Sequence, residues 1–561
     1  MTDLVWHPGL VLIAGATLLP WLRGVVRRVV VVAMPLLVLL LVWQLPDGPV
    51  WQLRFLDYTI TPLQGDKLAR LFATIFALMA ACGGLFALAQ KSRVELPAAY
   101  LYAGSAIGVV LAGDMLTMFA FWEMMAIGST VVLWSNGRES SYLAARRYIM
   151  IHLLGGVALF AGVTGHVVQT GDVAFGRMAL DSPAHWLILI GLLVNAGAPP
   201  LSAWLPDAYP EASWSGMVFL SAFTTKTAVY ALIRGFPGTE LLIWVGLFMV
   251  FYGIVYALLE NDMRRILAYS IVNQVGFMIA GIGIGTEMAL NGAAAHAFTH
   301  IIYKALLLMS AGSVMLMTGR RKCSDLGGLF RTMPLTTVCG TIGALAISSF
   351  PLTSGFVSKS MVSQAAADGH MLSVWLLLTA ASAGVFLHAG IKFPWFVFFQ
   401  KDSGLRPGEP PASMRWAMVL FAFLCIAIGV WPGLLYLLLP FAVTYEPYTG
   451  AHVVNQLQLL LFSGLAFFVM LPYLKRTLTI TLDTDWLWRR PLLAGVLVGQ
   501  RWLARLGVAA NALAGELGRR GLDALVQLCG RHGLLSRTST TRGMALWVLV
   551  LLLGYLLLNY R

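Results

Sequence analysis

Proline and glycine interrupt two apolar stretches of the chain, NAGAPPLSAWLPDAYPEA (Asn195–Ala212) and SSFPLTSGFVSK (Ser348–Lys359). Proline removes a backbone donor and breaks a helix, and at membrane depth the freed carbonyls need polar neighbours or a water-filled cavity. A pair of broken helices in matching positions of two halves is typical of a transporter built from inverted repeats. Two ordinary proline kinks are the alternative interpretation, because proline is frequent in membrane helices.

The sequence around these stretches is apolar throughout. The 561 residues are 59% hydrophobic and only 11% charged, whereas about a quarter of a soluble protein is charged. Apolar runs of roughly 20 residues, enough to cross about 30 Å of hydrocarbon, recur from end to end. We therefore expect an all-α polytopic membrane protein with about 16 transmembrane helices. The expected spans are 9–22, 25–43, 68–90, 98–112, 114–134, 148–168, 185–204, 214–235, 241–259, 266–284, 291–318, 334–360, 372–399, 414–438, 456–474 and 543–560.

The net charge of +13 follows from orientation in the membrane, because Lys and Arg gather in cytoplasmic loops. Nucleic-acid binding is not expected. Arg23, Arg27 and Arg28, between the first two spans, should be cytoplasmic, which places the N-terminus outside. Alternation of the spans then puts the other basic clusters on the inside as well, and this agreement favours an even number of helices. These clusters are Lys91/Arg93, Arg138/Arg146/Arg147, Arg264/Arg265, Arg320/Arg321/Lys322 and Lys475/Arg476.

The stretch 476–542 is rich in arginine, and from Trp502 to Leu528 it repeats apolar residues at helical spacing. A helix with one apolar stripe and one basic face lies along a surface rather than across the bilayer. Either lipid or a neighbouring subunit would cover this helix. The expected segments are N-terminal helices 1–65, a core 66–440, an accessory helix 441–475, the cytoplasmic surface segment 476–542 and a final span 543–561.

Neither export processing nor cysteine chemistry is indicated. The apolar run 11–22 continues after Arg23 into a second run without a small-residue cleavage site, so no removable signal peptide is expected. The five cysteines occur singly, without a CxxC pair, which predicts neither a disulfide framework nor a metal site. The sequence also lacks a Walker loop and a dinucleotide fingerprint. No cofactor is expected.

Ionisable residues in the middle of a span are costly and are functional candidates. Glu123 lies in MLTMFAFWEMMAIGSTVV and Lys226 in FLSAFTTKTAVYALI, while Lys359 directly follows the second interruption. A buried carboxylate needs a basic partner or water, and a buried lysine can release its proton and so carry one. We therefore expect all three residues on a proton path.

His296, His300 and Lys304 are spaced four residues apart in one apolar stretch. This spacing places them on one helix face, with about 12 Å of rise from the first to the last. Imidazoles exchange protons near neutral pH, so the row predicts a proton relay; a satisfied structural histidine is the alternative for each ring. Two histidines at this spacing without a third ligand or an HExxH pattern do not predict a metal site.

Six motifs in order resemble those of the antiporter-like subunits over roughly residues 65–440. That family comprises the Mrp-type multisubunit cation/proton antiporters and the proton-pumping membrane subunits of respiratory complex I and related hydrogenases. The chain is most similar to the D-type subunit of the Mrp antiporters, and its surface helix and last span resemble the extended complex I type. The motifs are FWE (Phe121–Glu123), PLSAWLPDAYPEA (Pro200–Ala212), TKTAVY (Thr225–Tyr230), NDMRRILAYSIVNQVGF (Asn261–Phe277), THIIYKALLLMSAGS (Thr299–Ser313) and SGFVSK (Ser354–Lys359).

The resemblance implies two inverted five-helix repeats, each with a broken helix, and a row of charges parallel to the membrane. By position, Glu123 matches the carboxylate of the family's fifth helix and Lys226 the lysine of its eighth. The histidine row matches the central relay, and Lys359 matches the charge at the second break. The family's carboxylate pairs with a lysine at the first break, and opening that pair gates proton movement.

This chain departs from the family at the first break. Asn195, which cannot titrate, holds the place of the lysine, and Ser202 stands where histidine is common. Glu123 is therefore expected to lack its usual partner or to draw on Lys226 instead. These departures imply altered coupling, a different ion or a half-channel that no longer conducts.

The resemblance implies a proton-translocating subunit of a multisubunit Na⁺ or K⁺/proton antiporter, similar to the D-type subunit of that class. Such a subunit is a secondary transporter rather than an enzyme. It lies in the cell inner membrane, and its partners are other membrane subunits, lipid, H⁺ and Na⁺ or K⁺. The alternatives are a non-conducting structural subunit, or the membrane subunit of a complex I-like, hydrogenase-like or inorganic-carbon uptake complex.

Overall fold

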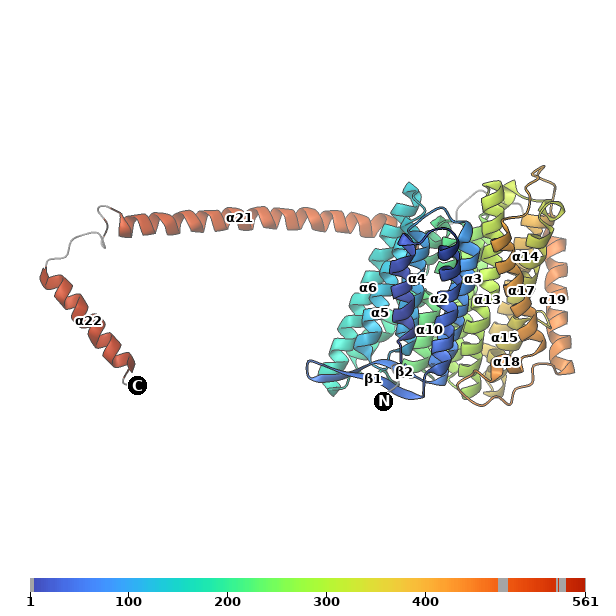
Figure 1. The fold of residues 1–561 in the computed structure, drawn as a ribbon, viewed down its shortest axis with the longest axis horizontal. Helices are drawn as coiled ribbons and strands as arrows, with labels where there is room; N and C mark the ends of the chain where they lie inside the picture. The colour runs from blue at the N-terminus through green and yellow to red at the C-terminus, as the bar shows by residue number, and fades with distance from the viewer. Residues whose placement is uncertain (1–4, 473–482, 531–532, 534–540, 560–561) are drawn as a thin grey trace. The chain divides into compact units, whose positions relative to one another are not determined.

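The computed structural model describes residues 5–472, 483–530, 533 and 541–559, which form two units, Met1–Asp485 and Trp486–Arg561. In the first unit long helices run side by side (Figure 1). Twelve helices of the described chain are long and apolar enough to cross a membrane. Four shorter apolar helices, Pro8–Trp21, Glu95–Leu111, Pro183–Ala196 and Pro334–Ile347, lie in the remaining predicted spans. The polytopic helical fold is confirmed, while the number sixteen stays a prediction.

Three α-helices and a hairpin precede the repeats. The hairpin was not predicted, because hydropathy reveals the long apolar helices and its two short strands give a much weaker signal. In it, Trp51, Leu53 and Phe55 alternate along one strand, and Leu56 takes a positive φ of 52° at the turn. The elements are α1 (Pro8–Leu18), η1 (Leu19–Trp21), α2 (Gly24–Gln44), β1 (Gly48–Phe55), β2 (Tyr58–Gly65), α3 (Lys67–Phe86) and η2 (Ala87–Ala89).

The first five-helix set follows α3. Its third helix, α6, has 32 residues and ends at Gly171 with a φ of 72°. Its fourth helix, α7, is the one that the sequence predicts to be broken. The elements of this set are α4 (Glu95–Leu111), α5 (Met115–Trp134), α6 (Glu139–Thr170), α7 (Pro183–Ala196), α8 (Trp204–Ala208), η3 (Tyr209–Glu211), α9 (Gly216–Leu220) and α10 (Thr224–Gly235).

The second set repeats the first with the same spacing. Its third helix, α13, also has 32 residues and ends at a left-handed glycine, Gly319. Because each set crosses the membrane five times, an odd number, the second set begins on the opposite side and is inverted. The elements are α11 (Leu241–Leu259), α12 (Met263–Ile284), α13 (Glu287–Thr318), η4 (Cys323–Asp325), η5 (Leu329–Arg331), α14 (Pro334–Ile347), α15 (Ser354–Asp368), α16 (Leu372–Val385) and two π-helical segments, η6 (Phe386–Lys392) and η7 (Trp395–Phe399).

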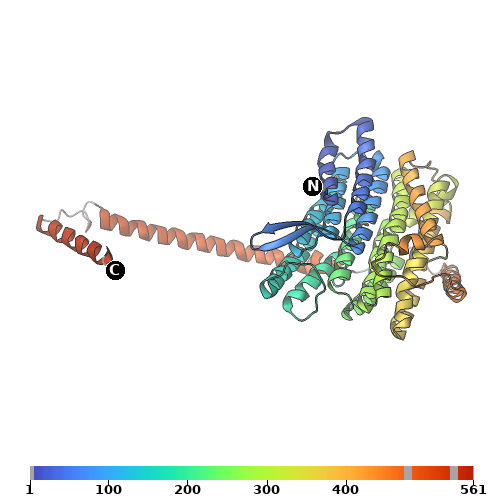
Figure 2. The same ribbon diagram turned by 60° about the horizontal axis from the view of Figure 1, so that its bottom comes forward.

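Individual residues mark the repeat. The N-caps of α5 and α12 are Asp114 and Asp262. The helices α6 and α13 begin at Glu139 and Glu287, and the number of residues between these two equals the number between the two N-caps. Each cap residue also bridges to an extended residue downstream, Asp114 to Ala174 and Asp262 to Lys322. The turned view in Figure 2 shows the two sets beside one another, blue to green and green to orange.

Both predicted interruptions are breaks in the fourth helix of a set. Gly197, with a φ of 79°, ends α7. After α14, Ser349 and Leu352 have positive φ values of 57° and 67°, which non-glycine residues rarely adopt. The second break also needs Gly355, because a Cβ there would lie 1.8 Å from the carbonyl oxygen of Ala346. The backbone of each break is therefore determined by residues with unusual conformational or steric demands.

Glycines allow neighbouring helices to approach closely. A Cβ on Gly191 of α7 would lie 2.8 Å from the carbonyl oxygen of Gly155 on α6, and a Cβ on Gly276 of α12 would lie 2.6 Å from that of Gly246 on α11. Small residues of this kind permit tight packing of membrane helices. The close approach of α6 to α7 brings the interior of α6 against the first break.

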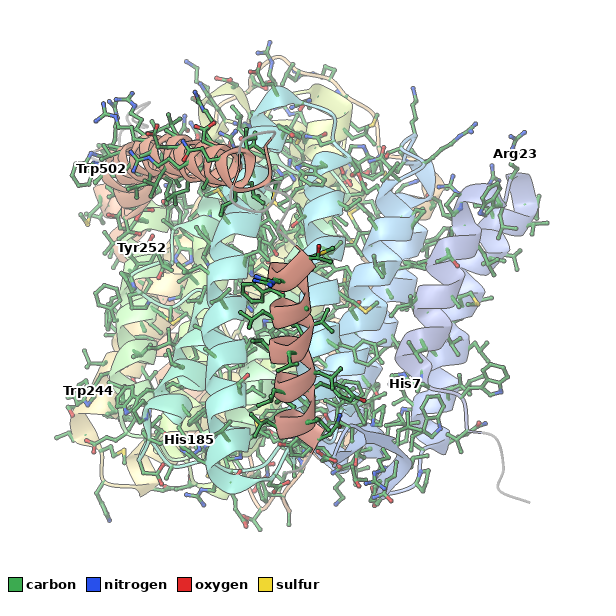
Figure 3. All side chains as sticks on the ribbon, turned by 90° about the vertical axis from the view of Figure 1, so that its left-hand side faces the viewer. His7, Arg23, His185, Trp244, Tyr252 and Trp502 are labelled. Carbon is green, nitrogen blue, oxygen red and sulfur yellow. The ribbon has the colours of Figure 1, made fainter. Side chains whose placement is uncertain are left out.

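Charged pairs gather at one end of the first unit, around the end of the first break. Arg147 donates to Asp207 at 2.7 Å, and Arg321 donates to Glu211 at 3.0 Å. The buried Arg264 donates to two backbone carbonyls after the break. Figure 3 shows Arg23 at one end of the helices and His7 and His185 at the other. Of the predicted basic clusters, Lys475/Arg476 lies outside the described residues.

The C-terminal part of the first unit adds helices beyond the repeats, and the second unit consists of helices. Every residue from Arg501 to Cys529 of α21 is exposed, and the predicted amphipathic helix Trp502–Leu528 lies within it. The remaining elements are α17 (Ala412–Val430), α18 (Gly433–Tyr436), α19 (Gly450–Met470), α20 (Asp485–Leu487), η8 (Trp488–Leu492), α21 (Leu493–Cys529) and α22 (Thr541–Asn559).

Candidate functional site

The predicted histidine row lies on α13, in the middle of the second repeat. His296, His300 and Lys304 have no exposed surface, and the two imidazole centroids are 6.2 Å apart. His296 Nδ1 lies 3.2 Å from Ser358 Oγ, and its Nε2 lies 3.1 Å from Gln274 Oε1. The row therefore connects α12 and α15 through hydrogen bonds at its first member.

His300, the middle member of the row, has no hydrogen-bond partner on either ring nitrogen among the described residues. Its ring packs edge-on against Tyr303 at 5.3 Å, and Tyr303 donates to Gln274 Oε1 at 3.1 Å. Buried polar atoms are nearly always paired with protein groups or ordered water. Water on both sides of His300 would complete a hydrogen-bonded chain along α13.

The two lysines that flank the row interact with neutral oxygens. Lys304 donates to Ser270 Oγ at 2.8 Å. Lys359 donates to the carbonyl oxygen of Ile347 at 3.1 Å, and its Nζ lies 4.8 Å from the ring centroid of Phe277. Ile347 is the last residue of α14, so the second break provides a helix C-terminus, which favours a nearby cation. The break thus explains why a lysine is placed there.

Lys226 occupies a similar position in the first repeat. It is fully buried and donates to the carbonyl oxygen of Ser221, the C-cap of α9, at 2.7 Å and to Thr225 Oγ1 at 3.0 Å. It lies within electrostatic reach of His300 and Lys304. Lys359 lies within electrostatic reach of the same two groups. The structure therefore brings these residues of both repeats into one row.

Glu123 lies apart from that row. Its Oε1 is buried without a hydrogen-bond partner, and within the described chain it forms no ion pair. The hydrogen bonds found for Lys226 are to Ser221 and Thr225, so the expected use of Lys226 as partner is absent from this structure. The carboxylate lies against Gly156 of α6, where a Cβ would be 2.2 Å from Oε1.

This contact gives a first testable prediction. Gly156→Ala should displace the Glu123 carboxylate while leaving the fold intact, because the clash is with the far end of a flexible side chain. We expect lower proton flux in the reconstituted complex and an unchanged melting temperature. Gly464→Ala, on α19, is the matched control, since its Cβ would meet ordinary contacts of 3.5 Å. Wild-type flux in Gly156→Ala would show that the position of the carboxylate is unimportant.

The two residues that depart from the family pattern are both buried. Asn195 is 2% exposed and Ser202 is 1% exposed. Neither Asn195 Oδ1 nor Ser202 Oγ has a partner among the residues that the structure describes. Trp204 donates from its indole to the carbonyl oxygen of Val194 at 2.9 Å. This hydrogen bond closes the segment that contains both residues and holds α8 against the end of α7.

Sequence reasoning missed several buried titratable residues, among them two histidines and a lysine within expected spans. His152 lies on α6, whereas His388 and Lys392 lie in η6. Lys392 donates to the carbonyl oxygens of Leu258 and Glu260 at the C-terminus of α11, at 2.5 and 2.6 Å. Ionisable residues in the middle of a span are functional candidates, and a search of the expected span 372–399 on this ground would have found His388 and Lys392. Aligning the two repeats would have found His152.

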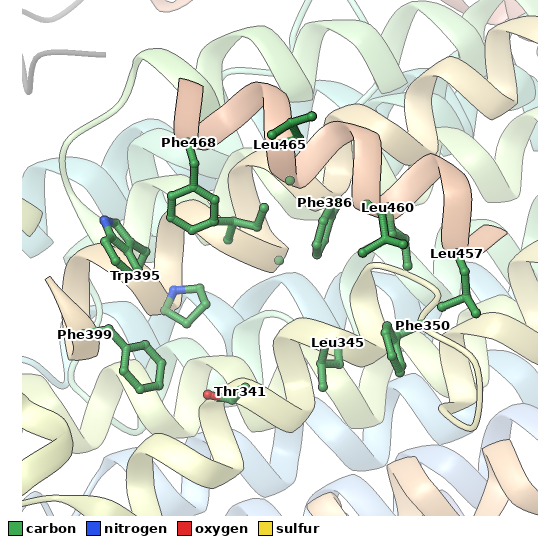
Figure 4. A pocket seen from close by; sticks show the side chains of 15 residues that line it. Thr341, Leu345, Phe350, Phe386, Trp395, Phe399, Leu457, Leu460, Leu465 and Phe468 are labelled. Atoms are coloured by element: carbon green, nitrogen blue, oxygen red, sulfur yellow. The ribbon is translucent and has the colours of Figure 1, made fainter. Parts of the chain in front are cut away.

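The apolar groove between α14, the π-helical segments and α19 is separate from this chemistry (Figure 4). Its volume is about 440 Å³, and Phe350, Phe386, Trp395 and Phe468 are among its walls. No charged side chain lines it. Its walls suit hydrocarbon rather than protons or cations. In the described chain, no three His, Cys, Asp or Glu residues are grouped to hold a metal ion.

Comparison with known proteins shows what the chain is similar to. Residues 112–386 match the family described as NADH:quinone oxidoreductase/Mrp antiporter, TM. The probable K⁺/H⁺ antiporter A/B-type subunit of Rhizobium meliloti (strain 1021) is 29% identical over 402 residues, 66% of this chain and 40% of that protein. The Na⁺/H⁺ antiporter D-type subunit of Alkalihalophilus pseudofirmus is 31% identical over 322 residues, 52% of this chain and 65% of that protein. The chain thus spans only part of the length of these relatives.

A solved structure has a similar fold. A chain in the Mrp complex from Dietzia sp. DQ12-45-1b superposes with a TM-score of 0.75 at 24% identity. The match covers 91% of this chain and 62% of that chain. It therefore extends well beyond residues 112–386 and includes helices outside the two repeats.

Proposed function

Because this chain belongs to the antiporter-like family of membrane subunits, we propose that it is a proton-translocating subunit of a multisubunit Na⁺ or K⁺/proton antiporter, similar in role to the D-type subunit. The observation that carries the proposal is the buried row of Lys226, His300, Lys304 and Lys359, which continues across both repeats. Glu123 and His296 complete the proposed path.

The chemistry of the row supports proton transfer. None of its amines and imidazoles forms an ion pair within the described chain, and their hydrogen bonds are to neutral oxygens. Like charges at close range disfavour one another, so a proton on Lys226 opposes a second proton on Lys304. Protons therefore advance along the row one group at a time, and each transfer changes the energy of the next.

The breaks support the same function. Each exposes helix-terminal carbonyls inside the bundle. Polar atoms without a hydrogen-bond partner among the described residues lie beside both: Asn195 and Ser202 at the first, Ser349 and Ser354 at the second. Water at these positions would connect the row to the two sides of the membrane. We place the subunit in the cell inner membrane, with other membrane subunits as partners and secondary transport rather than enzymatic catalysis as its role.

Asn195 favours a second candidate function. An amide cannot titrate, so a chain with Asn195 in place of a basic residue could serve as a membrane scaffold that binds partner subunits without conducting. In that case, replacing path residues would leave proton flux unchanged.

Proton flux in proteoliposomes containing the whole complex tests the proposal. We expect Glu123→Gln and Lys226→Ala each to reduce flux by on the order of a hundredfold, since positioned proton-transfer groups typically contribute about 10²–10⁴ in rate. Lys401→Ala, at an exposed lysine, is the control, and mass spectrometry checks that all subunits are retained. Unchanged flux in both path variants would refute conduction and favour the scaffold.

A further inference from the structure

His152 is a buried histidine on α6 whose ring is held by aromatic side chains. It is 2% exposed. Its ring centroid lies 4.1 Å from that of Tyr148 and 4.6 Å from that of Trp204. Despite this burial, Nε2 has no hydrogen-bond partner among the described residues. The ring is thus fixed in place while one nitrogen stays available.

Two further buried oxygens without a hydrogen-bond partner in the described chain belong to the helices that pack against α6 on either side of this turn. The amide of Asn195, at the end of α7, lies close enough to interact with the imidazole, but its Oδ1 forms no hydrogen bond of good geometry in the described chain. The unpartnered Oε1 of Glu123, on α5, lies against Gly156. Gly156 follows His152 by one helical turn on the same face, about 6 Å along the axis. Buried polar atoms from three helices therefore gather around one turn of α6 without partners in the described chain, and ordered water is the usual partner of such atoms.

The repeat relates His152 to the central row. The helices α6 and α13 begin at Glu139 and Glu287. His152 and His300 are equally far along the chain from these first residues. Each therefore stands at the same position of a 32-residue helix. Each also has at least one unpartnered ring nitrogen and packs against a tyrosine of its own helix. The first repeat thus contains a counterpart of the relay histidine.

A structural histidine in the same repeat looks different. His185 of α7 lies 2.7 Å from Asp181 Oδ1 through Nδ1 and 2.9 Å from His166 Nδ1 through Nε2. Both of its nitrogens are satisfied, as expected of a ring that only stabilises the fold. His152 lacks this arrangement although it is buried more deeply.

We propose that His152 is the proton-carrying group of the first repeat and that it works with Glu123. Nε2 accepts a proton from the water beside Asn195, which forms an imidazolium. The Glu123 carboxylate stabilises that charge until the proton leaves through water toward the row that begins at Lys226. An O–H bond of the donating water breaks as the N–H bond forms, and that water takes a replacement proton from the water chain behind it; when the proton leaves, the N–H bond breaks and an O–H bond forms on the accepting water. This inference rests on the proposed conduction and adds a carrier to it.

The experiment measures proton flux of the reconstituted complex as a function of pH. His152→Gln keeps the size and polarity of the side chain but cannot titrate, and we expect a loss of at least tenfold. His185→Gln is the matched control and should keep wild-type flux. All of these variants keep the titratable groups on the elements around His152. These groups are Tyr148, Glu123, Tyr209 and the Arg147–Asp207 pair.

Rescue separates a carrier from a structural residue. Asn195→Lys places an amine opposite position 152, so the double variant His152→Gln/Asn195→Lys should recover flux. Its pH profile should differ from that of the wild type, because an amine replaces an imidazole as the titrating group. In His152→Ala, added imidazole should also restore flux. Wild-type flux in His152→Gln overturns the proposal, and so does a loss that neither rescue restores.

The flux measurements distinguish a wrong assignment of His152 from a failure of the proposed function. If Glu123→Gln and Lys226→Ala both keep their flux, conduction itself is refuted, and this proposal with it. If those variants lose flux while His152→Gln does not, the subunit conducts and only the assignment of His152 is wrong.

Discussion

Replacing Lys304 by methionine should reduce proton flux through the reconstituted complex by on the order of a hundredfold or more, while the complex still assembles. Lys304 is fully buried and lies within electrostatic reach of both Lys226 and Lys359. It therefore joins the parts of the row that the two repeats contribute. Without it, a proton would have to pass directly between groups that no hydrogen bond connects.

Lys304→Met should change stability little. Methionine has a similar length and removes a buried amine, which is favourable, because burying a charge is costly. The losses are the hydrogen bond to Ser270 Oγ and the longer one to the carbonyl oxygen of Leu267, and an unsatisfied hydroxyl costs about 1–3 kcal/mol. These effects oppose each other. Thermal unfolding in detergent checks the balance, and Lys401→Met controls for the loss of a lysine. Flux near the wild-type value would remove Lys304 from the path.

Replacing Gly355 by alanine should destabilise the second break severely. The new Cβ would lie 1.8 Å from the carbonyl oxygen of Ala346, and that atom belongs to the backbone, so no side-chain rotation relieves the clash. Overpacking of a buried site costs typically about 1–3 kcal/mol, and displaced backbone costs more. Lys359 follows Gly355 by one turn of α15, so its hydrogen bond to Ile347 should be lost too.

The yield of folded protein and the melting temperature in detergent measure this effect. Gly464→Ala, in the middle of α19, is the control, because its new Cβ would lie 3.5 Å from the nearest side chain and alanine favours a helix. We expect a large loss for Gly355→Ala and none for the control. A normal melting temperature with normal flux in Gly355→Ala would mean that the break tolerates a different backbone path.

The family resemblance that six motifs indicate is confirmed by the match of residues 112–386 and by the relatives. Motifs of this kind are contiguous, so they survive without any knowledge of contacts. The roles of Glu123, Lys226, the histidine row and Lys359 remain proposals that the flux measurements test. The structure does show that Lys226 and Lys359 both lie within electrostatic reach of His300 and Lys304.

What the sequence could not reveal depends on contacts between helices distant in the chain. The sequence predicted that Glu123 lacks its usual lysine partner, but the contact of its carboxylate with Gly156 of α6 became visible only in the tertiary structure. His152 appeared to be one histidine in an ordinary span. Its unpartnered nitrogen and its position beside Asn195 follow from the close packing of α6 and α7 through Gly155 and Gly191.

The broken helices separate what the sequence determines from what only the tertiary structure determines. By itself, the sequence determined that the chain spans a membrane and where proline and glycine interrupt its helices, because hydropathy and backbone geometry are local properties. Only the tertiary structure decided which buried groups meet at each break. Partners are set by how closely helices pack, and here that distance depends on single glycines whose neighbours lie tens of residues away.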